Sequence, residues 1–154
     1  MNRKVFLFLS LLHIVAGVTG CNNEDDDNGI TGNEEESKVI AKLCATSWKL
    51  YGFGIDSNNI QKAEPSDCST CYVVKFEPDG SFSGKTTSNE FIGVYNATDE
   101  SFKIVNYGST KVGEFGDGYK FVDAFCLSFQ YEITEEGQLK LYYAQNDFLI
   151  FNPQ

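Results

Sequence analysis

The feature that most constrains the fold is a change in the spacing of apolar residues near residue 46 of this 154-residue chain. Beyond that point apolar and polar side chains alternate in short runs, which is the period of a half-buried β-strand. The clearest run covers residues 127–134, where Leu127, Phe129, Tyr131 and Ile133 should share one face. Short alternating runs separated by turn residues predict a mainly β fold, a small antiparallel β-barrel or sandwich.

About eight strands are expected, with one or two short helices. The strands are predicted at residues 47–53, 72–76, 81–85, 91–95, 101–105, 127–134, 139–143 and 148–151. Pro78-Asp79-Gly80 and the run 135–138 carry turn residues between paired strands. The polar stretch 55–70 is predicted to be a long loop.

Two segments have helical rather than strand spacing. Residues 34–45 follow a possible N-cap at Asn33, although the helix would begin after Ser37 if the glutamates belong to the preceding tail. Apolar residues between 119 and 126 recur at helical spacing after a possible cap at Asp117.

The N-terminus has the pattern of a secretory signal. Arg3 and Lys4 precede an apolar run over residues 5–18, which at about 14 residues is too short to span a bilayer. Val18-Thr19-Gly20-Cys21 resembles the lipobox of bacterial lipoproteins, in which the cysteine is acylated and becomes the first mature residue. The alternative is an ordinary signal peptide whose Cys21 enters a disulfide.

An acidic run follows the predicted cleavage site. Residues 22–27 are Asn-Asn-Glu-Asp-Asp-Asp, which resembles the export tag of surface lipoproteins of the Bacteroidetes. We therefore expect an outer-membrane lipoprotein exposed on the cell surface, with a periplasm-facing location as the alternative. A run of like charges is also typical of a solvated spacer. The expected division is a signal peptide at 1–20, a flexible acidic linker at 21–33 and one domain at 34–154.

Cleavage before Cys21 would exclude several kinds of chemistry. Met1, Arg3 and His13 are the only residues of their types, so the mature chain would lack the histidine of Ser-His-Asp catalysis and of common zinc sites. Ten basic and 22 acidic residues would remain, a net charge of −12. This charge disfavours nucleic acid as a partner, and it disfavours membrane contact other than the lipid anchor at Cys21.

The chain also resembles a known family between Trp48 and Phe151. The matching stretches, in order, are Trp48-Lys49-Leu50, residues 79–84, 93–95, 102–104, 119–125, 131–133, 139–141 and 149–151. Together they resemble the META domain of HslJ-like bacterial lipoproteins. The chain departs from that pattern at Thr87-Ser88-Asn89, where members often have Gly-Cys-Asn, and at Thr110, where a cysteine four residues later is missing. The resemblance implies a small envelope-anchored barrel with no established enzymatic activity. A lipocalin-like barrel is the alternative fold.

Four cysteines would remain if Cys21 is acylated: Cys44, Cys68, Cys71 and Cys126. Pairs of thiols in an oxidising compartment favour disulfides. Of three possible connectivities we favour Cys68–Cys71 with Cys44–Cys126. A redox motif at 68–71 is disfavoured because a strand follows it rather than a helix, and a four-cysteine zinc site is weaker still.

Catalytic carboxylates are a further possibility, with Asp99, Glu100, Asp117 and Asp123 nearest to loops. None of them matches a calcium loop, and solvated surface charge is the simpler interpretation. We therefore expect no enzyme activity, no metal and no cofactor.

The aromatic residues are the best candidates for binding. Six are placed by alternation where the side chain would be exposed: Tyr51, Phe53, Tyr107, Tyr119, Tyr142 and Tyr143. A cluster among them would form a patch for a glycan or protein ligand. The favoured function is a non-enzymatic binding or envelope-maintenance module. The alternatives are an accessory glycan-binding lipoprotein and an enzyme that uses thiols or carboxylates.

Overall fold

The computed structural model of this chain describes residues 38, 40–56, 59–99 and 101–154. The predicted signal peptide, Cys21 and the acidic linker lie outside the described residues, as does Glu100. Of the predicted N-terminal helix, residues 38 and 40–44 are described and are helical. Leu43 from this turn is fully buried, and its carbonyl accepts a 2.7 Å hydrogen bond from Trp48 Nε1.

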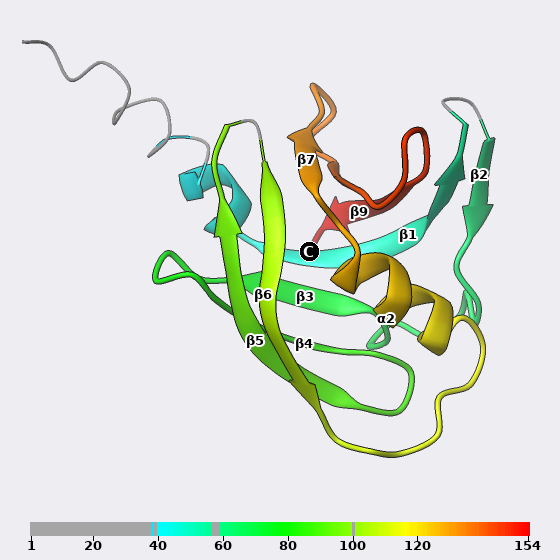
Figure 1. Cartoon of the computed structure of the whole chain (residues 1–154). Coiled ribbons are helices and arrows are strands. Elements are labelled where there is room, and N and C mark those ends of the chain that lie inside the picture. The colour runs from blue at the N-terminus through cyan, green and yellow to red at the C-terminus, as the bar shows by residue number, and fades with distance from the viewer. Residues whose placement is uncertain (1–37, 39, 57–58, 100) are drawn as a thin grey trace, which may run out of the picture.

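The described strands form one curled antiparallel sheet, an open half-barrel, which confirms the predicted mainly β fold (Figure 1). The strands are β1 (Ser47–Ile55), β2 (Asn59–Lys62), β3 (Val73–Phe76), β4 (Ser81–Lys85), β5 (Glu90–Ala97), β6 (Phe102–Ser109), β7 (Gln130–Ile133), β8 (Leu139–Tyr142) and β9 (Phe148–Pro153). Their order across the sheet is β6-β5-β4-β3-β1-β9-β8-β7, with β2 paired to β1 off this path.

Strand β2 corrects the prediction of an unbroken loop over residues 55–70. All four of its residues are exposed, so the stretch lacks the apolar alternation by which a half-buried strand is found in a sequence. It is specified by pairing instead, because β1 meets β3 at residues 47–49 and β2 at residues 52–55. The sheet therefore forks at the middle of β1.

The predicted strand over residues 127–134 is shorter in the structure, where only Gln130–Ile133 form a strand. This too corrects the prediction. Leu127 is the C-cap of a helix, and Leu127 and Phe129 are exposed rather than buried with Tyr131. The backbone of Phe129 nevertheless links the two ends of the curled sheet. Its carbonyl accepts from the N–H of Phe102 on β6, and its N–H donates to the carbonyl of Tyr142 on β8, both at 2.9 Å.

Two predicted turns depend on glycine. Gly80 has φ of 83° between β3 and β4, and Gly137 has φ of 79° between β7 and β8. Residues with a Cβ rarely adopt these values, so glycine lets each hairpin close tightly. The sequence predicted both turns, and at Gly80 it also predicted the residue that makes the turn possible.

Helix α2 (Gly118–Cys126) lies across the open mouth of the sheet (Figure 1). The helix begins after Asp117, as predicted, but the Asp117 side chain makes no capping bond. Its carboxylate instead accepts a 2.8 Å hydrogen bond from the N–H of Glu64. Asp117 therefore ties the start of α2 to the loop after β2.

Phe121 and Phe125 pack helix α2 against the sheet. Both are fully buried. The ring of Phe125 lies 5.3 Å from that of Phe82 on β4 and 5.7 Å from that of Phe91 on β5, between ring centroids. The ring of Phe121 reaches Phe151 on β9 at 6.4 Å. Two helical side chains thus join strands from both halves of the half-barrel.

Glycines on the inner surface make room for these rings. A Cβ at Gly84 would collide with the ring of Phe91, and one at Gly93 would collide with the ring of Phe82 and with the carbonyl of Asn106. Neither glycine has a positive φ. Glycine is therefore needed at these positions because a side chain would not fit, and not because of the backbone conformation.

Candidate functional site

Two of the six predicted surface aromatics share one hollow. Tyr119 on α2 is 64% exposed, and Tyr107 on β6 is partly buried with its ring stacked on that of Phe91 at 5.6 Å. They line a hollow of about 320 Å³ with Val122 of α2, which we call the tyrosine hollow. Its complete lining is Asn89, Tyr107, Ser109, Thr110, Lys111, Val112, Gly113, Glu114, Tyr119 and Val122.

The placement of Phe53 on the surface is wrong. The side chain is fully buried, and the ammonium of Lys120 lies 3.9 Å from its ring centroid. The reason is a register shift against β9 between Leu50 and Gly52. One extra residue on β1 reverses the alternation, so Tyr51 faces solvent while Phe53 faces the core.

The other three predicted aromatics lie away from the tyrosine hollow. Tyr51 lines a separate hollow. Tyr142 on β8 packs against Phe148 at 5.5 Å, and its hydroxyl donates to Glu132 Oε2 at 2.7 Å. Tyr143, which follows β8, is partly buried against the core. The six residues therefore do not form one patch, and the candidate site is reduced to the pair Tyr107 and Tyr119.

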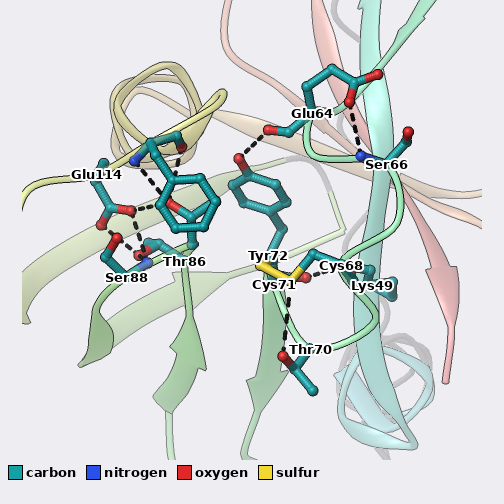
Figure 2. The surroundings of a disulfide bond; sticks show 12 residues. Lys49, Glu64, Ser66, Cys68, Thr70, Cys71, Tyr72, Thr86, Ser88 and Glu114 are labelled. Atoms are coloured by element: carbon teal, nitrogen blue, oxygen red, sulfur yellow. Dashed lines mark hydrogen bonds between the residues drawn. A yellow bond between two sulfur atoms is a disulfide. The ribbon is translucent and has the colours of Figure 1, made fainter.

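A hydrogen-bonded carboxylate holds one wall of the tyrosine hollow. Glu114 Oε1 accepts from the hydroxyl of Thr86 and the amide of Asn89, and Oε2 accepts from the hydroxyl of Thr87. The N–H of Ser88 adds a fourth bond to Oε2 at 3.2 Å. Figure 2 shows Glu114 directed at Thr86 and Ser88. Since a carboxylate offers about four acceptor positions, Glu114 acts as an anchor for the hollow.

Asn89 extends the same network to the segment that closes the hollow. Its side-chain oxygen accepts from the hydroxyl of Thr110 at 2.9 Å and from the N–H of Val112 at 2.7 Å. Its side-chain nitrogen donates to the carbonyl of Val112 at 2.7 Å. The segment 110–114, which has no strand or helix of its own, is thereby fixed to the end of β4 and the start of β5.

The network also sets the charge of Glu114. Partial burial pushes the pKa of its carboxyl group upward, but the hydrogen bonds from Thr86, Thr87 and Asn89 outweigh burial and leave the pKa below the ordinary value of 4.5. Burial raises the pKa of Tyr107. At neutral pH the hollow therefore presents a protonated phenol beside a carboxylate whose acceptor positions are occupied.

Sequence reasoning did not identify Thr86, Thr87, Asn89 or Glu114 as site residues. The available signal was the run Thr86–Asn89, because short polar side chains directly after a strand favour local hydrogen bonding. Glu114 gave no signal, since a single glutamate in a glycine-rich stretch looks like solvated surface charge. Its partners are 25 to 28 residues away in the sequence.

The cysteines confirm one predicted disulfide and contradict the other. Cys68 and Cys71 are bonded. Cys44 and Cys126 are free thiols, so the predicted Cys44–Cys126 bond is absent. Instead, Cys44 Sγ lies 3.3 Å from the hydroxyl of Tyr95, while Cys126 is exposed at the end of α2.

The predicted catalytic carboxylates that are described have separate surroundings, and no metal cluster is found in the described ranges. No group of three histidine, cysteine, aspartate or glutamate side chains there could hold a metal ion. Asp117 is engaged with the backbone of Glu64, and Asp123 is an exposed residue of α2. None of the helices within the described residues is long and apolar enough to cross a bilayer.

Comparison with known proteins identifies the fold and no activity. No protein-family model matches the chain, and no curated protein matches it by sequence. The structure is similar to that of a DUF4847 family protein from Bacteroides vulgatus, with a TM-score of 0.58, 17% identity, and coverage of 75% of this chain and 99% of the other. It is also similar to an NMR structure of a protein from Burkholderia xenovorans, with a TM-score of 0.59, 17% identity, and coverage of 76% and 87%.

The Glu114 network predicts a specific dependence of stability on pH. Because the folded pKa of Glu114 is lowered, its stabilising effect is complete above the unfolded pKa of about 4.5 and is lost as pH falls through the folded pKa. We expect Glu114→Gln to lower the free energy of unfolding by about 2 kcal/mol at pH 7, since it removes charged hydrogen bonds. The difference from wild type should shrink below about pH 4.

Urea unfolding at pH 7 and at pH 3.5 would measure this difference, with Glu135→Gln in an exposed turn as the control. Equal effects of the two substitutions at both pH values would show that the network does not anchor the hollow.

Proposed function

We propose that this protein is an outer-membrane lipoprotein whose META-like β domain is a non-enzymatic binding module, with the tyrosine hollow as its ligand site. The proposal rests on one observation, which is that Tyr107 and Tyr119 line the same hollow. Aromatic walls with a few fixed polar groups are typical of small-ligand sites. The proposal extends to the lipid anchor at Cys21 and to display on the cell surface, which are supported by the lipobox and the acidic run after it.

A neutral glycan is the ligand class that fits the tyrosine hollow best. Tyrosine offers an apolar ring face together with a polar hydroxyl. Ser109, Lys111 and the backbone of Gly113 supply further polar groups on the lining. The carboxylate of Glu114 is held by four hydrogen bonds, which favours binding over acid–base catalysis because proton transfer would disrupt the network.

Substitution of the exposed tyrosine tests the proposed site. An array of neutral oligosaccharides would first identify a glycan bound by the full-length protein. We expect Tyr119→Ala to weaken its binding about tenfold, because the stacking surface is lost. Tyr119→Phe should retain most of the affinity.

Isothermal titration would measure these affinities, with Tyr142→Ala on β8 as the matched control. If no array glycan binds, or if Tyr119→Ala binds as tightly as wild type, the tyrosine hollow is not a glycan site. A protein ligand would then have to be sought by pull-down with the same variants.

The lipid anchor has a separate test. In cells supplied with an alkyne-tagged fatty acid, the wild-type chain should be labelled and Cys21→Ser should lose the label, since the thiol of that residue is the proposed acylation site. Cys126→Ser, which changes another thiol, should keep it. Labelling of Cys21→Ser at the wild-type level would contradict the anchor.

A further inference from the structure

A second hollow lies where the sheet forks at the middle of β1. It measures about 220 Å³ and shares no lining residue with the tyrosine hollow. Lys49, Tyr51, Lys62 and Asn152 are among the residues that line it. We call it the lysine hollow. Its volume is below the roughly 300–1,000 Å³ of pockets for drug-sized ligands, so it suits one ring or one head group.

The bulge on β1 presents an aromatic ring to this hollow. Tyr51 lies at the register shift against β9 and is 39% exposed. Bulges of this kind redirect a side chain and are frequent beside functional sites. Lys62, on β2, holds its ammonium 5.7 Å from the centroid of the Tyr51 ring. The lining of the hollow therefore combines an aromatic ring with a cation close to it.

Lys49, on β1, brings a second cation to the lining of the hollow. Its ammonium donates to the carbonyl of Cys68 at 2.7 Å and to that of Cys71, and Figure 2 shows it beside the disulfide. Two of its three donors are thus used by uncharged groups. Burial lowers the pKa of this ammonium, as expected for a charge with too little compensation.

Neither cation has an ionic partner among the described residues. The salt bridges there are Lys75–Glu77 and Lys140–Glu132. The nearby carboxylate of Glu64 accepts from the N–H of Ser66 at 2.9 Å. The sequence has a net charge of −10, yet this hollow is lined by two lysines and by no carboxylate. It would therefore attract an anion.

Asn152 completes the donor set. It is the cross-strand partner of Lys49, and its side-chain oxygen accepts from Gln138 Nε2 at 2.8 Å. That bond orients the amide and leaves its N–H groups as donors. The lining of the lysine hollow thus combines two ammonium groups, an amide and an aromatic ring.

We propose that the lysine hollow binds the carboxylate of an acidic sugar, with Lys49, Lys62 and Asn152 on the anion and Tyr51 against the sugar ring. This is a second site, chemically distinct from the tyrosine hollow and independent of it. It would let one small domain recognise a uronate-containing glycan.

Titration of the full-length protein with glucuronate oligosaccharides tests this site. We expect saturable binding that weakens with added salt, and little binding of glucose oligosaccharides of equal length. Lys62→Gln should weaken glucuronate binding about tenfold, because a charged hydrogen bond is lost. Tyr51→Ala should weaken it as well. Lys103→Gln, an exposed lysine on β6, is the matched control.

Lys49→Gln is a second variant, accepted only if its circular dichroism is that of wild type, since Lys49 also holds the disulfide loop. The proposal is overturned if glucuronate does not bind, if glucose oligosaccharides bind equally well, or if Lys62→Gln and Lys103→Gln bind alike. Equal binding of inorganic sulfate, unaffected by Tyr51→Ala, would overturn the assignment to a sugar. Tyr119→Ala should leave glucuronate binding unchanged, which separates this site from the tyrosine hollow.

Discussion

The packing of Phe121 and Phe125 against the inner face of the sheet is the contact on which the rest of the structure depends. A curled sheet with an open mouth cannot exclude water from its aromatic lining by itself. Helix α2 supplies the cover, and its two rings meet rings from β4, β5 and β9. Gly84 and Gly93 belong to the same arrangement, because side chains there would collide with the rings of Phe91 and Phe82.

The tyrosine hollow depends on the position of helix α2. Tyr119 lies on the solvent side of the helix that Phe121 and Phe125 fix to the sheet, while Val122 is partly buried against the core. Tyr107 comes from β6, and all three side chains line the hollow. The segment 110–114, which also lines the hollow, depends on polar bonds instead, since Glu114 and Asn89 hold it in place. A ligand would therefore meet walls that are already in place, which reduces the entropy lost on binding. The lysine hollow has a different origin, the fork and bulge of β1.

Much of the fold could be predicted from the sequence, because alternation and turn residues are local signals. The hairpin turns at Gly80 and Gly137 and the start of α2 after Asp117 were found in this way. The predictions that were wrong concern features that depend on contacts between residues far apart in the sequence. Strand β2 is specified by pairing with β1 and not by its own pattern, and the bulge beside Tyr51 reverses the alternation that had placed Phe53 on the surface. The candidate site was predicted only in part, since hydrogen bonds to Glu114 across 25 to 28 residues leave no pattern in the sequence.

The stability of Phe125→Ala, compared with that of Tyr119→Ala on the same helix, tests the central role of α2 most directly. Phe125 is fully buried and Tyr119 is 64% exposed. Urea unfolding should show that Phe125→Ala loses about 3–5 kcal/mol, as for other buried phenylalanines, while Tyr119→Ala changes stability by no more than about 0.5 kcal/mol. A loss below about 1 kcal/mol for Phe125→Ala would contradict the account, because the sheet would then hold together without its helical cover.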